Sequence, residues 1–352
     1  MFVVNGRFLT QKPTGIQRYA FEMCNKLHEL GADFYVAIPQ KINPDYKFDF
    51  RTVTCGTLDT HLWEQINLPR YLKKNGNPLL ISFSGSGPLN YSNQIITIHD
   101  VSQERYPEWF SPNFVRFYHF MYPRVAKKSH AVITVSEFSK REIIDTLAIP
   151  SEKIHVVNCS AGHSLHRTTD PIENINTVDN EKFILTVSSM DPRKNFLRLV
   201  EAFKNIEDKS VKLYIIGMKF KAFNTPDLQD LITENVVMPG YLDDEALIER
   251  YRNALFFIYP SLYEGFGIPP LEAMSYGCPV INSDIPALRE TSGDGALYTD
   301  PYDIEDMTAK MNLLLQDDDL RKSFQTKGYE QVKKYSWEKS ARKVLDLANR
   351  YM

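Results

Sequence analysis

Residues 263–274, Tyr-Glu-Gly-Phe-Gly-Ile-Pro-Pro-Leu-Glu-Ala-Met, contain a turn between a predicted strand and a predicted helix. The apolar run 254–259 precedes them and predicts a buried strand. A Gly-Phe-Gly turn follows, and residues 270–276 predict a helix. Strand, turn and helix in this order form the repeating unit of α/β folds, whose ligands bind at the carboxyl ends of the strands. The stretch therefore predicts both the fold class and the position of a ligand site.

Two carboxylates in this stretch, Glu264 and Glu272, are separated by seven residues. The turn between them can also present free backbone N–H groups to the same crevice. Ionised glutamate offers only hydrogen-bond acceptors, and sugar hydroxyls are donors. The pair therefore suits a polyhydroxylated ligand.

The rest of the N-terminal half alternates between apolar strand-like runs and longer amphipathic segments. Strands are predicted at 2–4, 34–38, 79–83, 95–98, 131–135 and 154–157, and helices at 15–30, 62–74, 113–128 and 137–147. This alternation is typical of a parallel sheet covered on both faces.

The alternation lapses over the polar stretch 158–180, which we interpret as a connection between domains, and then resumes. Strands are predicted at 183–187, 213–216, 236–238, 255–258, 279–281 and 296–298, and helices at 195–205, 225–233, 243–253, 270–276, 304–316, 319–333 and 337–351. We therefore expect an α/β fold of two doubly wound Rossmann-like domains, residues 1–175 and 176–336, with a cleft between them.

Composition excludes several classes of protein. The chain has 352 residues, an apolar fraction of 43% and a net charge of −3, so two sizeable cores are expected and nucleic acid is not an expected partner. Its four cysteines lack metal-ligand spacing, which indicates buried free thiols. Residues 1–5 lack a basic signal-peptide region, and no run of 18 apolar residues occurs. We expect a soluble, cytoplasmic protein.

Two turns can hold a phosphate. Gly15 follows the first strand and opens a helix, where backbone N–H groups can approach an anion; the alternative is a simple helix cap. In the turn 187–195, Arg193 and Lys194 follow a strand and together can neutralise a diphosphate; the alternative is a solvated basic turn. The chain has no complete dinucleotide-binding glycine motif and no Walker A motif.

A histidine, His99, directly follows the predicted strand 95–98. At the carboxyl edge of the sheet, a neutral imidazole can make one hydrogen bond to a ligand or take a proton, although a purely structural histidine is the alternative. The acidic run 317–319 stands at a helix start, where it complements the helix dipole, so we expect no metal site.

Taken together, these motifs resemble the retaining glycosyltransferases of family four, which have the GT-B fold of two Rossmann-like domains. The resemblance covers most of the chain. The matching stretches are 6–19 (glycine loop and helix), Ile-His-Asp at 98–100, Thr-Val-Ser-Glu-Phe-Ser-Lys at 134–140, Asp-Pro-Arg-Lys-Asn at 191–195, Pro-Gly-Tyr-Leu-Asp-Asp-Glu-Ala-Leu at 239–247, and the two glutamates of 263–274. It also implies that the C-terminal helix, 337–352, packs back on the N-terminal domain.

The resemblance implies a role for each matching residue. Glu264 binds hydroxyls of the transferred sugar and Glu272 the ribose hydroxyls of the nucleotide. The catalytic set is completed by His99, which contacts the sugar near its reacting carbon, and by Arg193 and Lys194, which stabilise the leaving diphosphate. Gly15 and the backbone of Gly265, Phe266, Gly267 and Ile268 hold sugar and phosphate oxygens.

The implied activity is a metal-independent transfer of a hexose, with no cofactor, from a nucleotide-diphosphate sugar to a glycan or lipid-linked saccharide. GDP-mannose is the first expectation for the donor, and rhamnose, glucose, galactose and GlcNAc donors stay open. One departure is Ser188-Ser189, where many relatives carry Gly-Arg, so Arg193 and Lys194 are expected to carry the diphosphate charge alone. The alternatives are a GT-B sugar-nucleotide 2-epimerase and a non-catalytic sugar-nucleotide binder.

Residues 105–128 are rich in aromatic and cationic side chains. Phe110, Phe114, Phe117 and Met121 fit one face of a helix, which suits core packing. The alternative is an acceptor surface, or a patch that contacts the inner face of the membrane peripherally.

Overall fold

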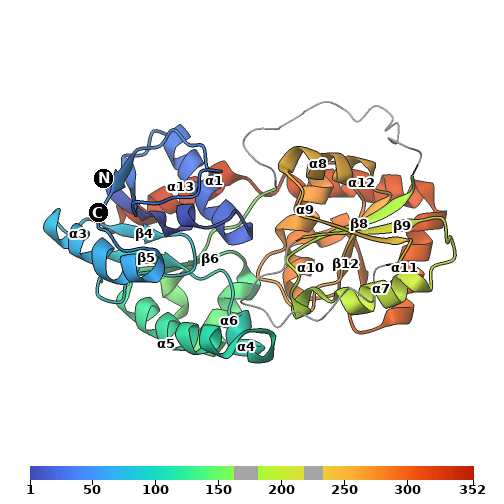
Figure 1. The fold of residues 1–352 in the computed structure, drawn as a ribbon, viewed down its shortest axis with the longest axis horizontal. Coiled ribbons are helices and arrows are strands. Elements are labelled where there is room, and N and C mark those ends of the chain that lie inside the picture. Colours follow the sequence, from blue (N-terminus) through green and yellow to red (C-terminus); the bar gives the residue numbers. More distant parts are fainter. Residues whose placement is uncertain (162–180, 218–232) are drawn as a thin grey trace. The chain divides into compact units, whose positions relative to one another are not determined.

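The computed structural model describes residues 1–161, 181–217 and 233–352, which divide into two units. The first unit comprises residues 1–105, 115–159 and 336–352, and the second comprises residues 106–114 and 160–335. The domain boundary predicted at 175/176 lies outside the described residues, as does nearly all of the helix predicted at 225–233. The described part of each unit is a parallel sheet with its helices (Figure 1).

The sheet of the first unit has seven parallel strands in the order β3-β2-β1-β4-β5-β6-β7. Its strands are β1 (Phe2–Asn5), β2 (Phe34–Ile38), β3 (Thr52–Thr54), β4 (Leu80–Ser82), β5 (Gln94–Thr97), β6 (Ala131–Thr134) and β7 (Ile154–Val156). All but β3 were predicted from apolar runs. The edge strand β3 escaped prediction because its Thr-Val-Thr sequence is short and partly exposed.

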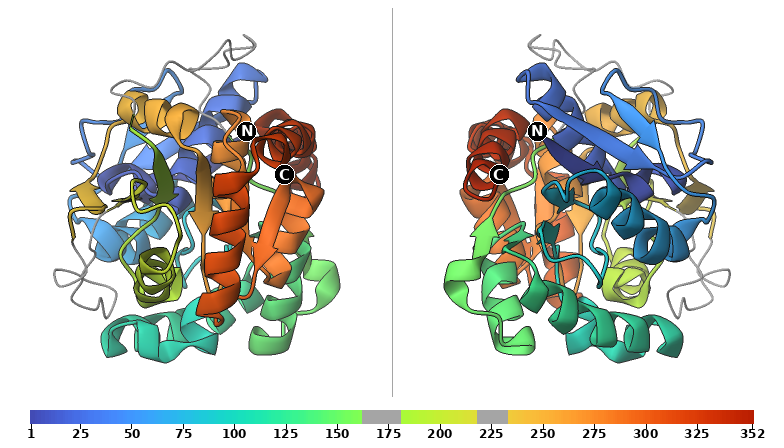
Figure 2. Two further views of the ribbon diagram at one scale, coloured as in Figure 1. Left: turned by 90° about the vertical axis from the view of Figure 1, so that its right-hand side faces the viewer. Right: turned by 90° about the vertical axis from the view of Figure 1, so that its left-hand side faces the viewer.

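The helices of the first unit are α1 (Gly15–Glu29), α2 (Thr60–Leu62), α3 (Leu68–Lys74), α4 (Ser102–Arg105), α5 (Pro112–Lys128), α6 (Glu137–Leu147) and α13 (Trp337–Asn349). The first three residues of α5 cluster with the second unit. The segment predicted as one helix over 62–74 contains a π-helical turn, Trp63–Asn67, before α3. The C-terminal helix α13 packs against α1: Trp337 contacts Tyr19 with ring centroids 5.7 Å apart, and Ser340 donates to the carbonyl of Asn158. Both termini accordingly lie in this unit, near each other (Figure 2).

The sheet of the second unit has six parallel strands in the order β10-β9-β8-β11-β12-β13. Its strands are β8 (Phe183–Val187), β9 (Lys212–Ile216), β10 (Val236–Gly240), β11 (Phe256–Tyr259), β12 (Val280–Ser283) and β13 (Ala296–Thr299). Strand order reverses beside β8, whose neighbours are β9 and β11. In open α/β sheets, such a reversal is where ligands bind.

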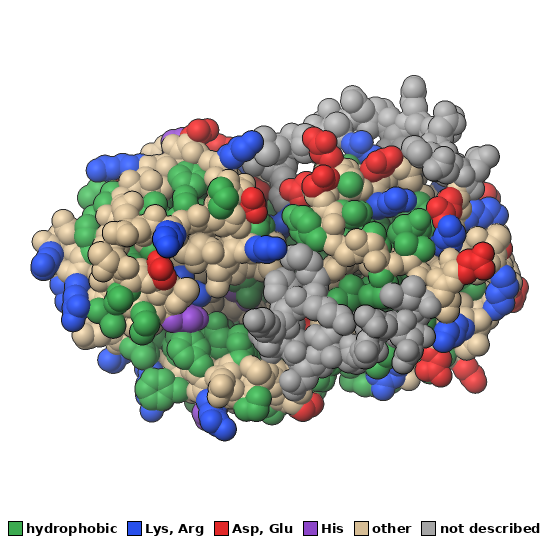
Figure 3. Space-filling model, in the orientation of Figure 1, with side chains coloured by type: hydrophobic (Ala, Val, Ile, Leu, Met, Phe, Trp, Pro, Cys, Tyr) green, Lys and Arg blue, Asp and Glu red, His purple; other side chains and the backbone are tan. Residues whose placement is uncertain are grey.

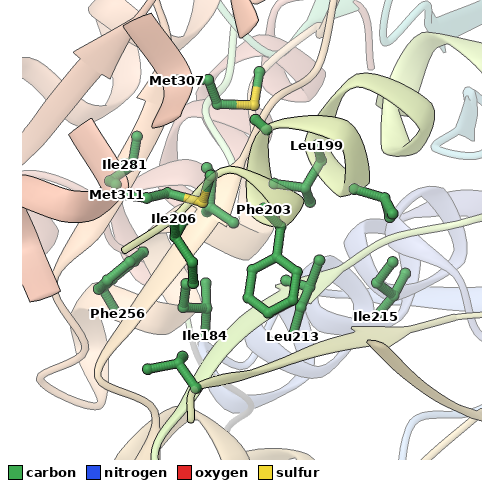
Figure 4. Close-up of a cluster of buried hydrophobic side chains, with 14 of the residues drawn as sticks. Ile184, Leu199, Phe203, Ile206, Leu213, Ile215, Phe256, Ile281, Met307 and Met311 are labelled. Atoms are coloured by element: carbon green, nitrogen blue, oxygen red, sulfur yellow. The ribbon is translucent and has the colours of Figure 1, made fainter. Parts of the chain in front are cut away.

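The helices of the second unit are α7 (Phe196–Lys204), α8 (Asp244–Asn253), α9 (Ile268–Ser275), α10 (Pro286–Ser292), α11 (Ile304–Gln316) and α12 (Asp318–Val332). A core of buried side chains joins α7 and α11 to the sheet, with Phe203 of α7 packing among aliphatic residues of β8 and β9 (Figure 4). Asp317 caps α12 by accepting from the Leu320 N–H. The sequence predicted a helix start here but not this cap. The short α10 was not predicted.

The aromatic segment around α5 does not form a single packed face. Met121 and Phe117 pack in the core of the first unit, as the helical pattern predicted. Phe110, however, precedes α5 and stacks on Phe114 in the part of the chain that clusters with the second unit. The prediction of one helical face for all four residues was therefore wrong, because the helix begins only at Pro112.

Two further predictions concern cysteines and the membrane. All four cysteines are buried free thiols, as predicted. No helix within residues 1–161, 181–217 and 233–352 has the length and apolar character needed to cross a membrane.

Candidate active site

A short 3-10 turn, Pro192–Lys194, follows β8 and carries the two predicted phosphate-binding cations. Asp191 caps this turn by accepting from the Arg193 N–H at 3.1 Å, and its other oxygen accepts from the Arg193 Nε at 3.3 Å and from the Ser189 hydroxyl at 2.9 Å. Asp191 is buried and Arg193 is half-buried. The aspartate thus fixes both the backbone and the guanidinium of Arg193.

Lys194 is buried in an ion pair with Glu264. Its Nζ donates to Glu264 Oε1 at 2.5 Å and to the Tyr259 hydroxyl at 2.8 Å. The exposed fractions of the Lys194, Glu264 and Tyr259 residues are 5%, 6% and 2%. An ammonium has three donors, and two of the three are used within the described residues. One N–H of Lys194 therefore remains to bind a ligand oxygen.

Lys194 lies in the turn after β8 and Glu264 in the segment after β11, and Asn195 connects these two segments. Its side-chain amide donates to the carbonyls of Pro260 at 3.1 Å and Pro301 at 2.7 Å. Asn195 has a left-handed backbone with φ of 61°, a conformation that asparagine tolerates better than most residues. In addition, the Leu262 N–H donates to the carbonyl of Arg193 at 2.7 Å. These bonds hold the end of β11 against the turn after β8.

The glycine turn 265–267 leads into α9. Gly267 has φ of 93°, and a Cβ at this position would lie 2.4 Å from Leu288 Cδ2, so only glycine fits. Phe266 is buried and its ring packs edge-on against Tyr335, with centroids 5.3 Å apart. The backbone of Phe266, and not its buried side chain, can therefore face a ligand. At the start of α9, Pro269 and Pro270 have no N–H, so it is the N–H of Ile268 that can bind an anion there.

Glu272 lies on α9 and is half-buried. Its Oε2 accepts from the Tyr251 hydroxyl of α8 at 3.3 Å. The two glutamates therefore have different surroundings, since Glu264 pairs with an ammonium and Glu272 with a phenol.

Opposing effects set the ionisation of the buried pair. Burial alone would raise the pKa of Glu264, but the charges of Lys194 and Arg193 outweigh it and lower that pKa. Burial likewise opposes the charge of Lys194, yet the Glu264 carboxylate raises the lysine pKa. Burial raises the pKa of Tyr259 to about 12, so this phenol stays neutral. At neutral pH, the cluster is a charged pair beside a neutral hydroxyl.

In the first unit, His99 stands two residues after the end of β5 and is almost fully buried. Its Nε2 lies 2.8 Å from the carbonyl oxygen of Phe83, and its ring meets Tyr19 edge-on at 4.9 Å. Burial lowers the pKa of His99 and favours the neutral ring. Because a carbonyl only accepts, Nε2 carries the proton and Nδ1 is left as an acceptor. This imidazole can accept one hydrogen bond from a hydroxyl.

Gly15 is the first residue of α1. Its φ is not positive, and a Cβ there would have no heavy atom within 4 Å. The fold therefore does not require glycine at this position. Its preceding residue, Thr14, provides no side-chain cap, so N–H groups at the start of α1 are available to a ligand.

Another buried ion pair, which lies in the first unit, was not predicted. Arg7 Nε lies 3.1 Å from Glu64 Oε1, and both side chains are almost fully buried. The same glutamate oxygen accepts from Asn5 at 2.7 Å and from Ser86 at 2.8 Å. Glu64 lies in the π-helical turn, and Asn5 ends β1, so the cluster fixes the carboxyl edge of this sheet.

Sequence reasoning also missed Asp191, Asn195 and Tyr259 as partners of the predicted site residues. The first two stand in the stretch 191–195 and their polarity was visible, but Tyr259 was counted only as part of a buried strand. No three His, Cys, Asp or Glu side chains in the described ranges lie close enough to share a metal ion.

Comparison with known proteins assigns the class. Two family models match consecutive parts of the chain: Glycosyltransferase Family 4 over residues 13–160 and Glycosyl transferases group 1 over residues 169–331. The chain is 30% identical to O-antigen chain mannosyltransferase B of Escherichia coli, over 92% of this chain and 93% of that protein. It is 29% identical to O-antigen chain mannosyltransferase RfbU of Salmonella typhimurium, over 86% and 87%. The protein is thus a hexosyltransferase.

Solved structures agree on the fold. WaaG, a glycosyltransferase involved in lipopolysaccharide biosynthesis, matches with a TM-score of 0.76 at 14% identity, over 99% of both chains. HepE of Anabaena, solved with UDP-glucose, matches with a TM-score of 0.72 at 14% identity and 99% coverage. These structures share the GT-B fold with the present one. The chain belongs to glycosyltransferase family 4.

Proposed function

We propose that this enzyme transfers mannose from GDP-mannose, with retention of the anomeric configuration, to a glycan or lipid-linked saccharide acceptor. The buried Lys194–Glu264 pair at the strand-order reversal of the second sheet carries the assignment of the donor site. The choice of mannose rests on the two O-antigen mannosyltransferase relatives.

In the proposed reaction, negative charge grows on the leaving diphosphate as the bond to the sugar breaks. Lys194 and Arg193 are held in place by Glu264 and Asp191 before the donor arrives, so little reorganisation is needed when that charge develops. The N–H groups of residues 265–268 and of Gly15 bind phosphate and sugar oxygens. These groups do the work of a metal ion, and we propose that none is needed.

Two glutamates and a histidine position the donor in this proposal. Glu264 accepts from hydroxyls of the transferred sugar, Glu272 from the ribose, and His99 Nδ1 from a sugar hydroxyl near the reacting carbon. Glu264 is engaged by the ammonium of Lys194, which makes it a poor covalent nucleophile. Retention is therefore proposed to arise from attack of the acceptor on the face that the diphosphate leaves.

Nucleotide selectivity tests the donor assignment. We expect GDP to raise the melting temperature more than UDP or dTDP, since a ligand at 100 times its Kd adds about 2.7 kcal/mol to the free energy of unfolding. GDP-mannose turnover should release GDP in the presence of EDTA, faster with acceptor than without. A 2-epimerase would interconvert sugars without acceptor-dependent release, and a non-catalytic binder would show the thermal shift alone.

The exposed face of α5 supports a peripheral membrane location at the inner membrane face, which we also propose. Phe120 is 50% exposed with the Arg124 guanidinium 3.9 Å from its ring centroid, and Arg116, Lys127 and Lys128 are exposed on the same helix. Hydrophobic side chains gather on the surface over α5 (Figure 3). Aromatic and basic side chains together suit an anionic lipid surface.

Vesicle binding tests this location. The wild-type protein should sediment with anionic vesicles at low salt, and Phe120→Ser should weaken this binding. Leu313→Ser is the matched control, because Leu313 is 41% exposed on α11 of the other unit. Failure of the wild-type protein to sediment would contradict the membrane proposal and leave the transferase proposal intact.

A further inference from the structure

An aromatic pair stands in the segment between α4 and α5. Tyr106 and Trp109 stack with ring centroids 4.2 Å apart and planes inclined by 13°. The 3-10 turn Pro107–Trp109 brings the two rings together, and the Trp109 N–H donates to the carbonyl of Tyr106 at 3.2 Å. Both rings are half-buried, so part of the pair is open to solvent.

This pair is held rigidly. The Phe110 N–H donates to the carbonyl of Pro107 at 3.1 Å, which closes the turn. Phe110 is buried and stacks on Phe114 with centroids 5.3 Å apart, so the residue after Trp109 anchors the segment. A fixed ring loses little conformational entropy when a ligand binds on it.

The pair lies at the sugar end of the proposed donor site. Tyr106 meets Tyr263 edge-on with centroids 5.5 Å apart, and all three rings belong to the second unit. Tyr263 is buried and directly precedes Glu264, the carboxylate paired with Lys194. Glu272, the proposed ribose ligand, is instead bonded to Tyr251 of α8. The contact through Tyr263 therefore connects the aromatic pair with the transferred sugar and not with the ribose or the base.

We infer that Tyr106 and Trp109 form a binding platform for a sugar ring of the acceptor saccharide. A pyranose presents an apolar face of C–H groups that can lie on an aromatic ring, while its hydroxyls need polar partners. Glu108, between the two rings in sequence, is exposed, and a carboxylate is a hydrogen-bond acceptor. Ligand sites commonly combine aromatic walls with a few polar groups in this way. The inference rests on the proposed transferase function and names the residues that bind its second substrate.

Intrinsic fluorescence can report on this platform directly. The chain has three tryptophans, of which Trp63 and Trp337 are buried, with exposed fractions of 0% and 7%. Trp109 is the half-buried one, so a sugar ring placed on the platform should change mainly its emission. We expect a saturable change when α-linked manno-, gluco- or galactotrioses are added, and no such change in Trp109→Phe. Absence of any change with all three trioses would overturn the platform.

Kinetics separates the platform from the donor site. Trp109→Ala and Tyr106→Ala should each raise the acceptor KM by roughly 10-fold or more, a loss of the size that removing an aromatic side chain causes for a stacked nucleobase. GDP affinity and acceptor-independent donor hydrolysis should stay unchanged, and Trp109→Phe should restore most of the acceptor affinity. Leu313→Ala, at an exposed apolar residue of α11, is the control with unchanged KM.

Other outcomes have distinct meanings. An unchanged acceptor KM in Trp109→Ala would refute the inference, as would an equal loss of GDP affinity, which would assign the rings to the nucleotide base. Failure of the transferase proposal would appear instead as wild-type protein with no GDP-mannose turnover and no thermal shift with any nucleotide. The fluorescence titration tests saccharide binding even in that case.

Discussion

Replacing Glu264 by Gln is expected to lower kcat by about 10²–10³, the loss typical when a preorganised charged or hydrogen-bonding group at the reacting centre is removed. In the wild-type protein, Glu264 Oε1 lies 2.5 Å from Lys194 Nζ. Gln keeps the size of the side chain but has no charge with which to form an ion pair with this ammonium. The lysine would be left as an unpaired buried cation, and burial would then lower its pKa. The substitution thus weakens both the sugar contact and the cation that faces the leaving diphosphate.

A double-mutant cycle tests whether the two side chains act as a unit. Lys194→Ala should lower kcat by a similar factor. In the double variant, Glu264→Gln with Lys194→Ala, kcat should fall by much less than the product of the two single-variant factors. Lys182→Ala is the matched control, because Lys182 makes an exposed ion pair with Asp208 at 3.7 Å in the same unit. Its kcat should not change.

Folding must be checked alongside, because breaking a buried pair also destabilises the protein. The circular dichroism spectrum and the melting temperature with saturating GDP show whether each variant is folded under assay conditions. Near-normal turnover in either folded single variant would refute the role given to that residue.

Most secondary structure was predictable because apolar periodicity is local. The boundaries of α6 and α11 agree with the predicted residues, since both helices carry regular amphipathic patterns. Elements without such a pattern were missed: β3 is a partly exposed edge strand, and α10 begins at a proline and has only seven residues.

The candidate site was predictable as a set of residues but not as a set of contacts. Lys194 and Glu264 are 70 residues apart, and their pairing depends on β8 and β11 being neighbours in the sheet. The sequence indicated cations for a diphosphate and carboxylates for a sugar. It gave no sign that one cation and one carboxylate neutralise each other in a buried pair with Tyr259. The pairing of Arg7 with Glu64 was hidden for the same reason.

Replacing Glu64 by Gln is expected to destabilise the first unit by about 3–5 kcal/mol at neutral pH, because Arg7 would keep a buried charge without its partner. The pKa of Glu64 supports a destabilisation of this magnitude. Burial opposes its ionisation, but Arg7, His61 and Asn5 outweigh burial and lower the pKa to about 2 from 4.5. By linkage, a folded-state pKa this far below the unfolded one contributes about 3 kcal/mol to the free energy of unfolding.

The sign of the pH dependence follows from that direction. A lowered carboxylate pKa stabilises the fold fully above the unfolded pKa of 4.5, and the stabilisation is lost as pH falls from there towards about 2. The difference in stability between the wild-type protein and Glu64→Gln should therefore be constant from pH 7 to about pH 5 and shrink below it. Glu338→Gln provides the contrast, because Glu338 is an exposed partner of Arg342 on α13. This control should cost less than about 1 kcal/mol at any of these pH values.

A Trp109→Phe background makes the measurement specific to the first unit. The two remaining indoles, Trp63 in the π-helical turn and Trp337 at the start of α13, both belong to that unit. Urea unfolding followed by their fluorescence then reports on the unit that contains Glu64. Because Gln keeps the shape of the side chain and its amide can still accept from Asn5 and Ser86, the loss measures the charge pair with Arg7 and not a cavity. The buried pair would not stabilise the sheet edge if Glu64→Gln lowered the free energy of unfolding by less than 1 kcal/mol at pH 7. The same would follow if this difference between the two proteins widened as the pH fell below 4.5.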